Sequence, residues 1–147
     1  MMKTSIPLIV ESLQGDGYHL FCSVKINRTK FLMVLDTGAS RSVFDTELLQ
    51  KYFQIETTEV GDKKSSSINS EVANSYLGLI DELKIGQLII PNYQAVMIDL
   101  AYVNDIYAQM ELPPVIGILG CDILVPYNAQ INLKKHNMSL FKPSEEI

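Results

Sequence analysis

The sequence lacks a long hydrophobic run and a basic region, and each absence excludes a class of protein. No stretch of its 147 residues approaches the roughly 18 consecutive apolar residues of a membrane-spanning helix. The formal net charge is −5, from 12 basic and 17 acidic residues, and no stripe of Lys and Arg is present to neutralise phosphates. The composition therefore argues against a membrane and against nucleic acid as partners.

A secretory signal and a cysteine motif are also missing. The apolar patch near the N-terminus is broken by Pro7 and is shorter than the ~7–15 residues that a secretory signal needs, so we expect a cytoplasmic protein. Cys22 and Cys121 lack the spacing of a redox or metal motif, and we expect buried, reduced thiols. With His19 and His136 they carry atoms that bind zinc, but the spacing is not a standard one. We therefore expect no metal and no cofactor.

The length and the residue pattern predict one mainly β domain. A chain of 147 residues, 47% of them hydrophobic, can bury a core of its own, and no repeat or linker divides it. Helical spacing is scarce, which indicates only two or three short helices. Short alternating or apolar runs predict strands, at residues 6–12, 18–26, 31–35, 76–85, 88–91, 93–98, 115–119, 129–133 and 138–141.

Three Asp residues stand where short helices are expected to begin. Asp45 precedes the first helix, Asp99 precedes an apolar stripe over residues 100–110, and Asp122 precedes residues 123–125. An Asp at the N-cap accepts a hydrogen bond from a backbone N–H of the first turn. We therefore predict a capping role for each of the three, and we interpret the apolar stripe as core.

One carboxylate stands at the end of an apolar strand. Asp36 follows the apolar residues 31–35 and is followed at once by Thr37 and Gly38. Placing a carboxylate next to an apolar surface costs free energy, unless the carboxylate is paired with another group or takes part in catalysis. Gly38 permits a tight turn, and the hydroxyl of Thr37 can lock the loop. Such a tripeptide occurs by chance in about one chain in fifteen of this length, so a second motif has to support it.

The second motif lies near the C-terminus. Residues Ile118, Leu119 and Gly120 are followed by a predicted final hairpin. With this pair of motifs the sequence resembles the aspartic proteases, specifically the single-domain, retropepsin-like branch. In that family an Asp-Thr/Ser-Gly loop is followed much later by two bulky apolar residues and a Gly, which run behind the catalytic loop and support it. The resemblance spans residues 18–141.

The resemblance implies the fold and the functional residues. It implies a closed β-barrel or sandwich of the retropepsin-like acid protease type, with residues 1–147 as one domain and a core over about residues 18–142. It implies that Asp36, Thr37 and Gly38 are catalytic. The residues implied in substrate binding follow the loop or lie at the tip of a flap over the cleft, namely Ala39, Ser40, Ser66, Ser67, Ile68 and Asn69.

The chain has only one Asp-Thr/Ser-Gly and is too short for the two-lobed form of the family. Aspartic peptide hydrolysis needs two carboxylates that share one proton, one acting as base on a water and the other as acid to the carbonyl. The second Asp36 must therefore come from a second copy, in a C2 homodimer. We expect an endopeptidase that holds its peptide or protein substrate in an extended conformation across the dimer.

Two departures from the family pattern carry further expectations. Many members have Ser where this chain has Ala39, and without that hydroxyl donor we expect a less acidic carboxylate pair and a mildly acidic pH optimum. The segment over residues 63–75 contains no Gly, whereas the flaps of the family are often Gly-rich. This second departure leaves an alternative open, a retropepsin-like fold that binds peptides or dimerises with little or no hydrolysis.

Overall fold

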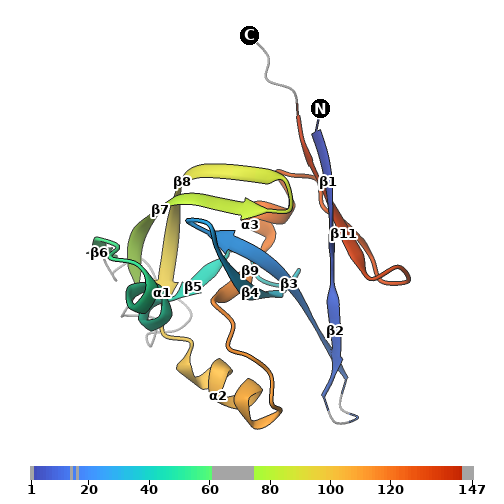
Figure 1. Ribbon diagram of the computed structural model, residues 1–147, viewed down its shortest axis with the longest axis horizontal. Coiled ribbons are helices and arrows are strands. Elements are labelled where there is room, and N and C mark those ends of the chain that lie inside the picture. The colour runs from blue at the N-terminus through green and yellow to red at the C-terminus, as the bar shows by residue number, and fades with distance from the viewer. Residues whose placement is uncertain (1, 14, 16, 61–74, 144–147) are drawn as a thin grey trace.

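The computed structural model describes residues 2–13, 15, 17–60 and 75–143. Within these ranges the chain is built mainly of strands with three short helices (Figure 1), so the predicted fold class is confirmed. The helices are α1 (Thr46–Tyr52), α2 (Ala101–Gln109) and α3 (Cys121–Leu124). The strands are β1 (Met2–Pro7), β2 (Ile9–Ser12), β3 (Tyr18–Ile26), β4 (Thr29–Leu35), β5 (Val43–Asp45), β6 (Thr57–Glu59), β7 (Tyr76–Ile85), β8 (Leu88–Ile98), β9 (Gly117–Leu119), β10 (Gln130–Asn132) and β11 (Asn137–Lys142).

Six of these strands close into a barrel. They pair in the order β3, β4, β9, β5, β8 and β7, and the pairing of β7 with β3 closes the ring. The β4–β9 and β5–β8 pairs are parallel, and the other pairs are antiparallel. The hairpin turn between β7 and β8 contains Gly86 at φ +63°, a backbone conformation that glycine adopts readily. The sequence patterns did not predict the short strands β5 and β6.

A second sheet of β1, β11 and β10 lies beside the barrel (Figure 1). The single strand predicted over residues 6–12 is wrong, because β1 belongs to this sheet whereas β2 pairs with β3 of the barrel sheet. The chain changes sheets after Pro7, the last residue of β1, which still pairs with Asn137 of β11. The next N–H, that of Leu8, donates to the carbonyl of His136 at 2.8 Å.

The core fills the barrel with side chains that alternate inward along the strands. Cys22, Met33, Phe44 and Leu119 are among its fully buried members, so the prediction of a buried thiol is confirmed for Cys22. Cys121 is only half-buried, and the same prediction is wrong there. A smaller cluster of Phe21, Tyr107 and Val115 packs α2 against the barrel.

The three predicted caps have different outcomes. Asp45 is the N-cap of α1, and its Oδ2 accepts the Leu48 N–H at 3.0 Å, as predicted. Asp99 accepts the Ala101 N–H at 2.9 Å, but the N-cap position of α2 belongs to the following residue. The predicted cap at Asp122 is wrong, because α3 begins at Cys121, two residues before the predicted start, and its N-cap is Gly120.

Candidate functional site

Asp36 lies at the point where β4 leaves the barrel. Its N–H donates to the carbonyl of Leu119 at 3.0 Å, which continues the pairing of β4 with β9. The chain then turns tightly, since the Ala39 N–H donates to the Asp36 carbonyl at 3.1 Å. The Gly38 N–H donates to Oδ1 of Asp36 at 2.9 Å. The loop thereby orients its own carboxylate, while Asp36 and Thr37 stay exposed in the single chain.

The residues predicted to support this loop lie directly beneath it. A Cβ on Gly120 would lie 2.7 Å from the Ala39 carbonyl oxygen, so only glycine fits this crossing without displacing backbone. The Cys121 N–H donates to the same oxygen at 2.8 Å, and its Sγ donates to the Thr37 carbonyl at 3.2 Å. Ile118 pairs in the sheet with Val34 and Val43. The structure thus brings the two sequence motifs into contact.

A hydrogen-bond network that sequence reasoning missed fixes the far side of the loop. The Ser42 hydroxyl accepts the Gly120 N–H at 2.8 Å and donates to Oδ1 of Asp122 at 2.7 Å. The Tyr93 hydroxyl donates to the other oxygen of Asp122 at 3.4 Å. Burial, followed by the charge of Asp122, raises the pKa of Tyr93, so its hydroxyl stays protonated as a donor.

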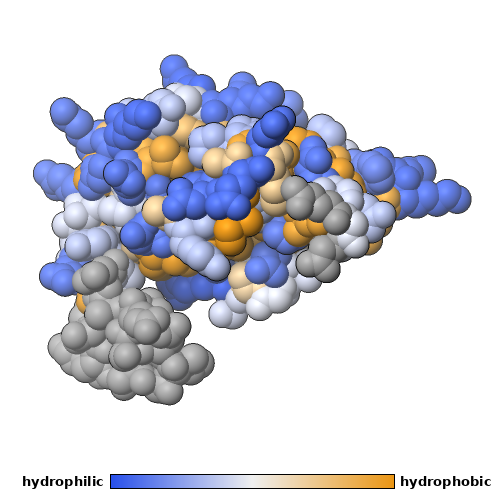
Figure 2. Space-filling view, turned by 90° about the horizontal axis from the view of Figure 1, so that it is seen from below, coloured by the Kyte–Doolittle hydropathy of each residue, from blue (hydrophilic) through white to orange (hydrophobic). Residues whose placement is uncertain are grey.

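A cavity of about 420 Å³ opens beside the carboxylate. Most of its wall is apolar, but five of its ten lining residues carry polar side chains, among them His19 on β3 and Tyr107 on α2. This composition is typical of a small-ligand or side-chain pocket. Figure 2 shows apolar surface between hydrophilic side chains on the side of the molecule that carries α2. The lining residues are Tyr18, His19, Leu20, Val34, Leu35, Asp36, Thr37, Val103, Tyr107 and Ile118.

Two of these polar side chains, His19 and Tyr107, bind each other. Nδ1 of His19 and the hydroxyl of Tyr107 are 2.6 Å apart, and the two rings meet edge to face with centroids 5.5 Å apart. Burial, followed by the charge of Asp36, raises the pKa of Tyr107. The pair joins α2 to β3 next to Asp36. The sequence carried no signal for it, because Tyr107 belongs to the stripe interpreted as core.

The remaining predicted site residues are placed only in part. Ala39 is half-buried and Ser40 is exposed, and both follow the Asp36 loop. The flap residues Ser66, Ser67, Ile68 and Asn69 lie outside the described residues.

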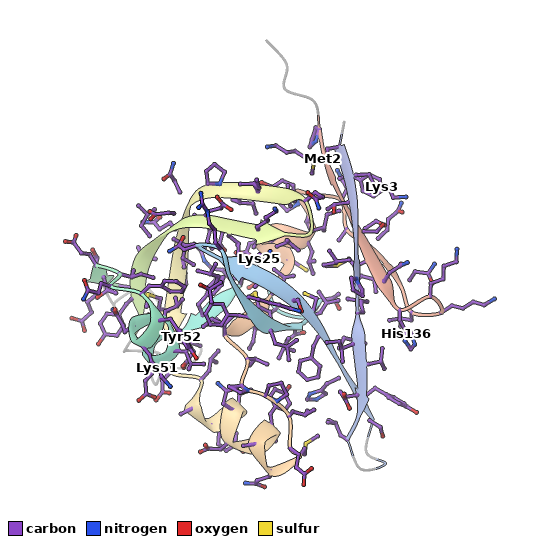
Figure 3. All side chains as sticks on the ribbon, in the orientation of Figure 1. Met2, Lys3, Lys25, Lys51, Tyr52 and His136 are labelled. Atoms are coloured by element: carbon purple, nitrogen blue, oxygen red, sulfur yellow. The ribbon has the colours of Figure 1, made fainter. Side chains whose placement is uncertain are left out.

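The four side chains with zinc-binding atoms have separate environments. His19 binds Tyr107, Cys22 is in the core, Cys121 lies under the loop, and His136 is exposed on the β10–β11 hairpin (Figure 3). In the part of the chain that the structure describes, no group of three His, Cys, Asp or Glu could hold a metal ion. Of the described helices, none is long and apolar enough to cross a membrane.

Comparison with known proteins identifies the family and the fold. Residues 22–123 match the sequence model of a family described as aspartyl protease. A retropepsin-like aspartic protease from Rickettsia conorii is similar in structure, with a TM-score of 0.57 and 19% identity over 95% of this chain and 91% of that chain. The retroviral protease-like domain of Ddi1 from Leishmania major has a TM-score of 0.55 and 16% identity, covering 83% and 87%. No curated protein sequence matches the chain significantly. At these identities the structural likeness shows the fold, and the resemblance inferred from the two motifs is confirmed.

Proposed function

Because this chain belongs to the aspartyl protease family, we propose that it is an endopeptidase that uses the Asp36 carboxylates of two copies. The observation that carries the proposal is the geometry of Asp36 itself. Its carboxylate is exposed at the tip of a loop, oriented by the Gly38 N–H, and supported from beneath by Gly120. A carboxylate held in this way is half of the pair that the reaction needs.

The second half comes from a second copy of the chain. In a C2 homodimer the two loops meet at the two-fold axis, and the two carboxylates share one proton, because close like charges cannot both ionise cheaply. One carboxylate takes a proton from a water, whose oxygen attacks the scissile carbonyl carbon, and the other protonates the carbonyl oxygen. Collapse of this intermediate breaks the C–N bond, and the amine leaves with a proton. The hydroxyl of Thr37 ties the paired loops together.

The substrate is an extended peptide with a large apolar side chain next to the bond that is cut. The cavity beside Asp36 supports this preference, since its volume of about 420 Å³ and its apolar walls suit such a side chain. Ala39, Ser40 and residues 66–69 contribute to binding of the peptide. In this proposal residues 1–147 act as one domain.

A peptide-library digest tests the proposal. The purified chain is incubated with the library between about pH 4 and pH 7, and the products are identified by mass spectrometry. We expect cleavage with a mildly acidic optimum, and loss of cleavage to background in Asp36→Asn. The exposed Asp81 provides the matched control, and Asp81→Asn should cleave at the wild-type rate.

A mixing experiment tests the dimer separately. Wild-type chain and Asp36→Asn chain are mixed in varying ratios and allowed to exchange subunits. If both carboxylates are needed, activity falls with the square of the wild-type fraction. A linear fall, or a monomeric mass in light scattering at working concentration, would contradict the shared site.

The alternative function is a module that binds peptides or dimerises without hydrolysis, and the absence of Gly from residues 63–75 favours it. In that case the wild-type chain binds library peptides over the whole pH range and releases no products. The Asp36→Asn variant would then bind the same peptides with unchanged affinity.

A further inference from the structure

Three lysines face one another across the outer wall of the barrel. Lys25 on β3 pairs directly with Lys30 on β4 and with Lys84 on β7. Figure 3 labels Lys25, on β3 where that strand pairs with β7. Neighbouring strands lie about 4.8 Å apart, so the backbone positions of Lys30 and Lys84 are about 10 Å apart with Lys25 between them. Like charges directly opposite each other destabilise a sheet, and an anion bound at this lysine row would relieve the repulsion.

A groove with a volume of about 360 Å³ adjoins the lysine row. Apolar side chains of Ile6, Pro7 and Val24 line it together with the three lysines. No acidic residue is among its described lining residues. Within the described ranges, none of the three ammonium groups has an ion-pair partner either. The row is therefore an unneutralised positive site in a chain whose net charge is −5.

We propose that the lysine row binds an acidic segment of an extended peptide, with an apolar side chain of that segment in the adjoining groove. Alternate side chains of an extended chain are about 7 Å apart, so two or three carboxylates match a row about 10 Å long. A single compact anion would reach only part of the row. The net negative charge of the chain opposes long polyanions such as nucleic acid.

The lysine row is distinct from the Asp36 loop. Lys30 precedes Asp36 by six residues along β4, a separation of about 20 Å in an extended strand. Binding at the row therefore does not depend on hydrolysis, and the two proposals can fail separately. The test uses Asp36→Asn chain, so that cleavage of the probe cannot affect the result.

The probe is the acetylated, amidated peptide Glu-Ala-Glu-Ala-Leu, whose two Glu side chains and Leu side chain point to one side of an extended chain, and its counterpart Gln-Ala-Gln-Ala-Leu lacks the charges. Calorimetric titration at low salt should show binding of the acidic peptide, at least tenfold tighter than that of its counterpart and weakened by added salt. Replacing the row by Lys25→Gln, Lys30→Gln and Lys84→Gln together should weaken binding at least tenfold. The control combines Lys51→Gln, Lys134→Gln and Lys135→Gln, which removes the same charge from lysines outside the row and should leave the affinity unchanged.

Two outcomes would overturn the proposal. One is an equal loss of affinity in the control variant, which would show only a response to net charge. The other is an affinity that the row variant leaves unchanged, which would place the peptide elsewhere, for example in the Asp36 cavity. If the triple variant fails to fold, Lys25→Gln alone serves, and it should both weaken binding and raise the melting temperature by removing the central charge.

Discussion

Ser42 donates two hydrogen bonds to one oxygen of Asp122, from its N–H at 2.8 Å and from its hydroxyl at 2.7 Å. The same hydroxyl accepts the N–H of Gly120 at 2.8 Å. Because Gly120 also lies under the carbonyl of Ala39, this relationship fixes the chain after the Asp36 loop against the start of α3. The two segments that carry the sequence motifs are thus joined by side-chain hydrogen bonds as well as by packing.

Removing the carboxylate of Asp122 should loosen this junction. Asp122→Ala leaves two donors of Ser42 without their acceptor, and we expect the free energy of unfolding to fall by about 1–3 kcal/mol, with a lower kcat/KM toward a peptide substrate. Asp122→Asn keeps one carbonyl oxygen that can accept both bonds, so its loss should be smaller. Urea denaturation and peptide kinetics on both variants measure this. Equal losses in the two variants would show that the charge matters rather than the acceptor.

Asp45 supports α1 and α2 together. Its side chain is only 3% exposed, and besides the N–H of Leu48 it accepts that of Leu100 at 2.7 Å. Asp45→Ala should lower the free energy of unfolding by about 2–4 kcal/mol, from the lost cap and from a buried N–H left unpaired. Asp45→Asn retains one of the two acceptors and should lose less. Thermal or urea unfolding measures the difference, and a loss below about 1 kcal/mol in Asp45→Ala would contradict the double role.

Local sequence patterns correctly predicted structural features that depend on residues close together in the sequence. The apolar run before Asp36 and the cap at Asp45 each follow from the chemistry of a few consecutive positions. The cap assigned to Asp122 failed because its partner, Ser42, lies 80 residues away along the chain. A residue type that suits an N-cap also suits any other pair of donors, and only the folded chain decides between them.

The polar pair in the cavity beside Asp36 could not be predicted from local sequence patterns either. His19 and Tyr107 are 88 residues apart in sequence, and no local pattern links a strand residue to one face of a later helix. The contact of Gly120 with the Asp36 loop is likewise a long-range feature, yet it was expected, because the resemblance to a family implied that residues 118–120 run behind that loop. The sequence thus predicted the loop and its support, but not the side chains that surround the space beside it.

The hydroxyl of Tyr107 should influence how the proposed substrate is held. Tyr107→Phe keeps the ring against Phe21 but loses the 2.6 Å bond to His19, and we expect about 1 kcal/mol less stability. For peptides with a large apolar residue next to the scissile bond, KM should change several-fold, with a smaller change in kcat. The control is Tyr102→Phe, since Tyr102 is on the same helix and is 77% exposed. Equal effects of the two substitutions would argue against a role for the pair.

The buried thiol of Cys22 should make the free energy of unfolding depend on pH in the alkaline range. Cys22 is fully buried, and burial raises the pKa of its thiol from 9.0 to about 12. Between these values the unfolded chain has lost a proton that the folded chain retains, so the free energy of unfolding falls as pH rises. The stabilisation is fully present below about pH 9, and its loss should proceed at about 1.4 kcal/mol per pH unit until the folded thiol ionises.

One variant, Cys22→Ala, separates this contribution from other alkaline effects. Tyr93 and Tyr107, whose pKa values are also raised by burial, should steepen the fall above about pH 10 in every variant. Cys22→Ala should be less stable at neutral pH because it leaves a cavity, but its stability should fall less steeply between pH 9 and pH 11. Urea denaturation at a series of pH values measures the slopes, and parallel slopes for wild type and Cys22→Ala would contradict the assignment, because the titrating group would then lie elsewhere.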